Sequence, residues 1–122
     1  DAWGSWQKIT AALGSQLLVV GDDLLASNPK RVEKAQAEKA CNAAIIKPNQ
    51  IGTVSETLAV AKMAKDLGWK TIVSHRSGET NDSFVAEFAV GMGSDFVKFG
   101  APARGERIAK YNRLLAIENE LK

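Results

Sequence analysis

The 122-residue sequence has little of several residue types on which whole classes of protein depend. Its one cysteine, Cys41, cannot form a disulfide within the chain, and its one histidine, His75, excludes a metal site built from several histidines. No apolar run approaches the ~20 residues that span a bilayer, and no basic-then-apolar signal segment opens the chain. We therefore expect a protein of the reducing cytoplasm with no membrane span.

The excess of one sign of charge over the other is also small. Lys and Arg number 16 against 14 Asp and Glu, a formal net charge of +2, and no basic cluster is long enough to follow a phosphate backbone. We therefore expect no binding to DNA. The hydrophobic fraction of 45% and the charged fraction of 25% are typical of a folded globular domain, and they exclude a disordered tail.

The chain opens on Asp1 rather than on a methionine. This start predicts either that a leader or tag has been removed or that the sequence is the downstream part of a longer protein. No linker or low-complexity segment divides residues 1–122, so we expect no domain boundary within them.

Short apolar runs alternate along the chain with longer amphipathic patterns, after an initial helical pattern at residues 6–13. Strands that are apolar on both faces and are each followed by a helix indicate parallel βα units. A whole (β/α)₈ barrel needs ~200–250 residues, and the acidic turn at residues 21–23 is unlike the glycine-rich turn of a doubly wound sheet. We therefore predict an α/β fold of parallel βα units that form about half of a TIM-type barrel. The expected strands lie at 17–20, 43–46, 70–73 and 96–99, and the expected helices at 29–39, 53–67, 82–90 and 106–121.

Polar residues stand at the carboxyl ends of these strands, where function gathers in parallel βα arrays. An acid pair after the first strand could take part in chemistry at this rim, or could simply start a turn or cap a helix. A lysine after the second could act as a general base or be ion-paired, and the lone histidine after the third could be structural. A neighbouring guanidinium and hydroxyl could bind phosphate. The residues concerned are Asp22, Asp23, Lys47, His75, Arg76, Ser77 and Lys98.

Other residues have plainer interpretations. Cys41 lies between a helix and a strand and is expected to be a packing residue. Lys98, between Val97 and Phe99, would face either the barrel interior or the outer helices. The helix at 106–121 is expected to be a solvated amphipathic helix, with its apolar positions at Ile108, Leu114, Leu115 and Ile117.

Four motifs, in order and at matching spacing, closely resemble the enolase family, the glycolytic phosphopyruvate hydratases. They are VGDDL at 20–24, IKPNQIGT at 46–53, SHRSGET at 74–80 and KFGAPARGER at 98–107. The likeness covers essentially the whole chain and implies that residues 1–122 are the carboxyl-terminal half of an enolase-like barrel domain. The amino-terminal domain and the first half of the barrel are absent from this sequence. Pro48 stands where many members have valine, and Phe99 where many have threonine, neither at a catalytic position.

The resemblance also implies a role for each candidate. Asp22 is similar to a ligand of the tight Mg²⁺, and Lys47 to the base that removes the C2 proton of 2-phosphoglycerate to give phosphoenolpyruvate. His75 resembles the active-site histidine, and Arg76 with Ser77 the phosphate-binding pair. Lys98 resembles the lysine that neutralises the substrate carboxylate and its enolate form.

The family needs three carboxylates on its tight metal and a glutamate general acid, and this chain supplies only Asp22. We therefore expect the 122-residue chain alone to be catalytically inactive, and the parent to be a cytoplasmic homo-oligomer that some members also present at the cell surface or secrete. Two alternatives stay open. One is a non-catalytic interaction fragment, bound by RNA-processing assemblies or by plasminogen through Lys122, and the other is a half barrel that pairs with a second copy.

Overall fold

The computed structural model describes residues 2–122, which form a four-stranded sheet and six helices. The strands are β1 (Val20–Gly21), β2 (Ala43–Ile46), β3 (Lys70–Ser74) and β4 (Phe96–Lys98). The helices are α1 (Trp3–Leu13), α2 (Pro29–Ala37), α3 (Pro48–Ile51), α4 (Val54–Asp66), α5 (Phe84–Gly91) and α6 (Gly105–Leu121).

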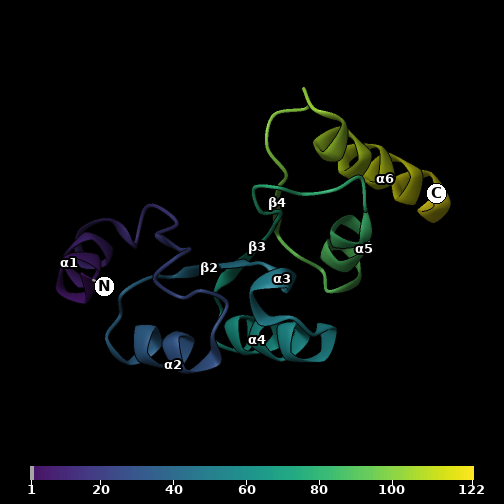
Figure 1. The fold of residues 1–122 in the computed structure, drawn as a ribbon. Coiled ribbons are helices and arrows are strands. Elements are labelled where there is room, and N and C mark those ends of the chain that lie inside the picture. The colour runs from purple at the N-terminus through teal and green to yellow at the C-terminus, as the bar shows by residue number, and fades with distance from the viewer. Residues whose placement is uncertain (1) are drawn as a thin grey trace.

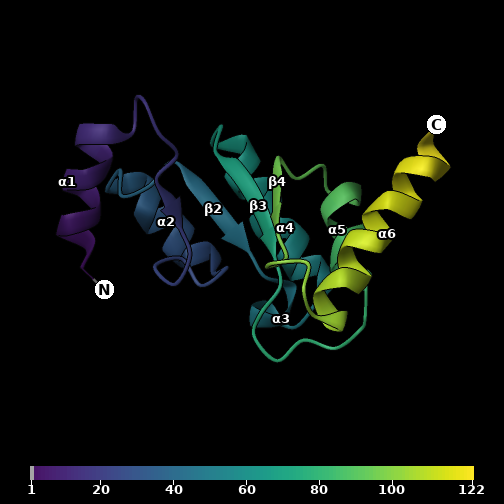
Figure 2. The same ribbon diagram turned by 90° about the horizontal axis from the view of Figure 1, so that it is seen from above.

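The sheet is parallel throughout and follows chain order, β1-β2-β3-β4. Ile45 pairs with Ile72 and Val73 with Val97, so neighbouring strands end at about the same level. The helices form an arc outside the sheet in Figure 1, and α1 and α6 lie at its two ends in Figure 2. This is the predicted arrangement of a partial barrel, with strands inside and helices outside.

Both faces of the sheet are apolar, as the uninterrupted runs predicted. Alternate residues of a strand point to opposite faces. Ala44, Ile46 and Val73 therefore join the main core against the helices, and Ile45 and Ile72 belong to a separate cluster on the other face. A sheet buried on both sides by branched residues is what a barrel wall requires.

Local capping explains where the helices begin. The Asn28 side chain accepts from the Lys30 N–H, and Pro29 occupies the first position of α2, where its missing N–H has no consequence. The Thr53 side chain accepts from the Glu56 N–H at the start of α4, which explains why this helix begins there. Among residues 2–122, no helix has both the length and the apolar composition needed to cross a bilayer.

The edge strands differ from expectation. The first was expected at 17–20, but only Val20 and Gly21 pair, and Leu17 and Leu18 are exposed. The last was expected to be covered on both faces, yet Phe96 and Val97 are exposed. Both strands have a neighbour on one side only in the described chain, so fewer side chains cover them.

Two further segments show features that were not predicted. Residues 48–51, between the expected strand at 43–46 and the expected helix at 53–67, form the short helix α3, since Pro48 can begin a helix directly after the strand. Of the four expected apolar positions of α6, Ile117 is buried and Leu114 packs against the core, whereas Ile108 and Leu115 are exposed. Lys110 on the same helix is fully buried. Cys41 is a buried packing residue as predicted, and burial raises the pKa of its thiol to about 11.

The fully buried Ile46 provides a test of the core. The Ile46→Ala change should lower the free energy of unfolding by about 2–5 kcal/mol, because it removes buried carbon and leaves a cavity. The matched control is Ile9→Ala on α1, where the side chain is 50% exposed and the change should stay within about 0.5 kcal/mol. Urea unfolding would measure both, and equal losses would contradict the described core.

Candidate functional site

The four strand ends bring the predicted polar residues to one rim of the sheet. Asp22 follows β1, Lys47 follows β2, His75 follows β3, and Lys98 is the last residue of β4. A cleft of about 360 Å³ opens on this rim. Its lining consists of Asp23, Lys47, Gln50, His75, Arg76, Ser77, Lys98 and Arg107. Among these residues the cationic groups outnumber the one acid, so the cleft favours anions.

Asp22 lies between the two lysines. Its Oδ1 is 2.5 Å from the Lys47 Nζ, and its Oδ2 is 3.5 Å from the Lys98 Nζ. The Lys47 side chain is 12% exposed and that of Lys98 54% exposed, so the carboxylate joins a shielded ammonium to a solvated one. Lys98 is thus directed at the rim, towards Asp22, rather than at the outer helices.

The backbone of Lys47 is held by a residue that the sequence analysis did not single out. Its N–H donates to the Ser27 Oγ at 3.0 Å, and the Ser27 hydroxyl donates to the Gln50 Oε1 at 2.7 Å. Ser27 is buried and has a φ of 50°, in the left-handed region that serine seldom adopts. These contacts fix the start of α3 and hence the direction of the Lys47 side chain. No local sequence signal marks them, since the partners are 20 residues apart or more.

His75 is anchored to the neighbouring strand. Its Nδ1 lies 2.8 Å from the Lys98 carbonyl oxygen, and its backbone N–H donates to the same oxygen at 3.2 Å. A carbonyl oxygen can only accept, so Nδ1 carries the proton, and in the neutral ring Nε2 is left as an acceptor. The contact therefore fixes the ring of His75 at the cleft.

Arg76 and Ser77 are exposed on the loop that follows β3. The Arg76 N–H donates to the Glu79 Oε1 at 2.9 Å, so Glu79 closes the loop on itself. Glu79 belongs to the SHRSGET motif at 74–80, and the sequence analysis gave it no role of its own. The Glu79 side chain is the second residue of the site, after Ser27, that the sequence analysis did not single out. Its position three residues after Arg76 could have suggested that its carboxylate accepts from the Arg76 N–H.

A divalent metal would not be held by these residues alone. Among residues 2–122, no three side chains of His, Cys, Asp or Glu gather closely enough to bind one. Mg²⁺ requires several fixed oxygens, and at this rim Asp22 offers one carboxylate whose two oxygens already face ammonium groups. Asp22 can therefore contribute a ligand but cannot form the site.

Comparison with known proteins gives consistent matches. The sequence model of the family described as enolase, C-terminal TIM barrel domain, matches residues 1–122. The chain is 56% identical over 121 residues to "Enolase" of Solanum lycopersicum, and 54% identical over 121 residues to "Enolase B" of Dictyostelium discoideum and to "Enolase 2" of Hevea brasiliensis. Each match covers 99% of this chain and 27% of the relative, so the chain spans about a quarter of the length of these curated relatives.

The position of Asp22 between two lysines allows the effect of its charge on anion binding in the cleft to be tested. In Asp22→Asn both ammonium groups lose their counter-charge, and the Kd for inorganic phosphate should fall about threefold, since an ion pair of this exposure is worth ~0.2–1 kcal/mol. Asp66→Asn, which breaks the exposed pair with Lys62, is the matched control and should leave the Kd unchanged. Titration followed by NMR at low ionic strength would measure both. Equal effects of the two changes would contradict the described charge arrangement.

Proposed function

This chain belongs to the enolase family, and from that premise we propose that it is the carboxyl-terminal half of the barrel domain of a cytoplasmic phosphopyruvate hydratase. The proposed reaction interconverts 2-phosphoglycerate and phosphoenolpyruvate. The observation that carries the proposal is the set of strand ends, where two lysines flank one carboxylate beside a loop with an arginine and a serine. The remaining half of the barrel and the amino-terminal domain would belong to a part of the protein outside these 122 residues.

Lys47 is the proposed base. Removing the C2 proton of 2-phosphoglycerate places a second negative charge beside the substrate carboxylate, so the proton leaves only where positive charge is already fixed. The Lys47 side chain is mostly shielded, and its backbone is held by Ser27 at the start of α3. Once it has lost its ammonium proton, a shielded amine in a fixed position can accept a proton from one defined carbon.

Lys98 has the complementary role in this proposal. Its ammonium is half-exposed and lies on the other side of Asp22 from Lys47. A substrate carboxylate that enters the cleft would meet this ammonium, which would stabilise the charge that develops as the proton is lost. The two lysines thus divide the work, one accepting the proton and one holding the charge.

Arg76 and Ser77 are the proposed phosphate-binding pair, with His75 beside them. A guanidinium binds phosphate oxygens in a two-pronged geometry, and a hydroxyl adds a third donor. Arg107 lines the same cleft and adds positive charge there. The fixed ring of His75 would face the substrate between the phosphate-binding loop and Lys98.

Mg²⁺ is the proposed cofactor, with Asp22 as the one ligand that this chain supplies. When bound, the metal would draw charge from the substrate carboxylate and make the C2 proton more acidic. The other carboxylate ligands, and the acid that protonates the departing hydroxide, would come from outside residues 1–122.

A chimaera would test Lys47 in a complete enzyme. We expect residues 1–122 to support turnover when they replace the matching 121-residue segment of the tomato enolase. Lys47→Ala in the chimaera should lower kcat by roughly 10²–10⁴-fold, the usual contribution of a positioned base. Lys62→Ala, at an exposed lysine on α4, is the control and should leave kcat unchanged. An active chimaera that tolerates Lys47→Ala would refute the assignment of the base.

The 122-residue chain alone should show no dehydration of 2-phosphoglycerate, because one carboxylate cannot form the metal site. The assay follows phosphoenolpyruvate by its ultraviolet absorbance in the presence of Mg²⁺, with Lys47→Ala measured beside the unaltered chain. Turnover clearly above that of the variant would overturn this expectation.

A further inference from the structure

A lysine that lines no part of the cleft is completely buried in this chain. Lys110 lies on α6 with 0% of its side chain exposed. Lysine is almost never fully buried unless its charge is paired, because removing an ammonium from water is costly. The contacts that Lys110 makes therefore need a physical explanation.

All the donors of this ammonium are used. The Lys110 Nζ lies 3.2 Å from the Glu79 Oε2, and it donates to the Thr80 carbonyl at 3.1 Å and to the Glu106 carbonyl at 2.8 Å. Glu106 is one turn away on the same helix, so that bond directs the ammonium. The other two contacts reach residues of the loop after β3. An ammonium has three donors, and here each has a partner.

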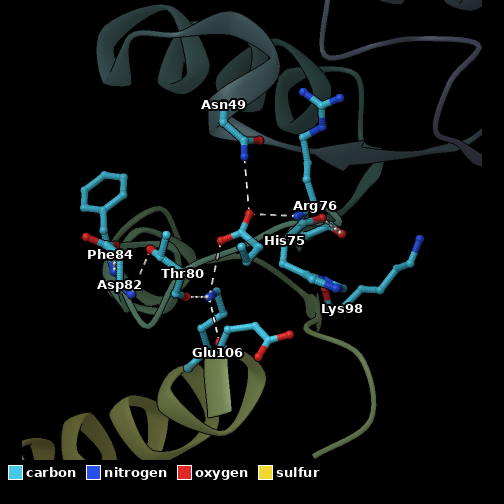
Figure 3. A network of polar contacts seen from close by, with 11 residues as sticks. Asn49, His75, Arg76, Thr80, Asp82, Phe84, Lys98 and Glu106 are labelled. Atoms are coloured by element: carbon cyan, nitrogen blue, oxygen red, sulfur yellow. Dashed lines mark hydrogen bonds and ion pairs between the residues drawn. The ribbon is translucent and has the colours of Figure 1, made fainter. Parts of the chain in front are cut away.

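Glu79 carries the connection across the loop to another helix. Its Oε2 meets Lys110, and its Oε1 accepts from the Arg76 N–H at 2.9 Å and from the Asn49 Nδ2 at 3.3 Å. Figure 3 shows Asn49 and Glu106 on opposite sides of the segment that carries His75 and Arg76. One carboxylate therefore joins this segment to α3 and, through Lys110, to α6.

Little else holds this loop. In the described chain, every hydrogen bond between residues 76–80 and a helix involves Glu79 or Lys110. Arg76, Ser77 and Gly78 are exposed, and Gly78 has a φ of 78°. Since a buried ion pair is seldom more stable than apolar residues of the same volume, stability alone does not explain this one. The pair also makes hydrogen bonds to the Arg76 N–H and the Thr80 carbonyl, which two apolar side chains could not make.

We propose that Lys110 and Glu79 are positioning residues, which hold the loop at 76–80 so that Arg76 and Ser77 meet a phosphate group in one fixed geometry. The identity of that group as the substrate phosphate rests on the proposed function. Neither residue touches the substrate. Their effect reaches it through the Arg76 backbone and the Thr80 carbonyl.

Two variants separate positioning from support of the whole fold. Lys110→Met keeps most of the side-chain volume and removes the ammonium. Glu79→Gln keeps an oxygen that can accept from the Arg76 N–H and removes the charge, so it remains informative should the buried methionine prevent folding. Lys62→Met, at an exposed ion pair on α4, is the matched control.

The first measurement is amide hydrogen exchange by NMR, which reports the opening of each segment separately. In Lys110→Met we expect exchange of the Arg76 amide, which donates to the Glu79 Oε1, to rise about tenfold while the amides of β2 and β3 keep their rates. Glu79→Gln should have a smaller effect in the same segment, and Lys62→Met none. An unchanged loop in both folded variants, or strands that open as much as the loop, would overturn the proposal.

The second measurement is titration with inorganic phosphate. Its Kd should rise about fivefold in Lys110→Met, because the loop then spends less time in the competent geometry. A Kd unchanged in both variants despite faster loop exchange would also overturn the proposal. If the unaltered chain binds no phosphate, the proposed function fails at this loop, and the exchange experiment still decides whether Lys110 and Glu79 hold it.

Discussion

The parallel pairing of the four strands is the constraint on which the rest of the structure depends. Parallel strands place all their carboxyl ends at one rim, so Asp22, Lys47, His75 and Lys98 meet although they are distant in sequence. The same pairing requires each connection to return outside the sheet, which places the helices in an arc and buries the outward face of the central strands. The cleft at this rim is a consequence of that topology.

Three lysines have a carboxylate partner before any ligand enters, although the cleft as a whole stays cationic. Asp22 pairs with two ammonium groups that would otherwise repel each other. Glu79 supplies the counter-charge for the buried ammonium of Lys110. The two carboxylates differ in what surrounds them. Asp22 adjoins an open, cationic cleft, whereas Glu79 is tied by directional bonds to a loop and a helix. The first arrangement can give way to a ligand, and the second can keep a loop in place.

Much of this arrangement could be predicted from the sequence. The branched runs at 43–46 and 70–73 identified the two central strands, because a strand covered on both sides has no polar alternation. The proline after Asn28 and the threonine three residues before Glu56 located the starts of two helices. The convergence of the site residues followed from the order of strands and helices alone.

The rest could not be predicted, because it depends on neighbours distant in the chain. Leu17 and Phe96 have the composition of core residues, but they lie at the sheet edges, where few side chains reach them. Lys110 occupies a charged position in an amphipathic pattern, which predicts exposure. Its burial is a result of the loop after β3, some 30 residues earlier in the chain, folding over it. The role of Ser27 in holding Lys47 likewise arises from a contact between separate turns.

The fixation of the loop by α6 also sets an order of events during synthesis of the chain. Residues 76–80 leave the ribosome well before Lys110, and until that lysine arrives the Glu79 carboxylate lacks its buried counter-charge. The strands β2 and β3 can pair without it, since their contacts are local to earlier segments. If Lys110 holds the loop as proposed, residues 76–80 are therefore fixed only after β2 and β3 can pair.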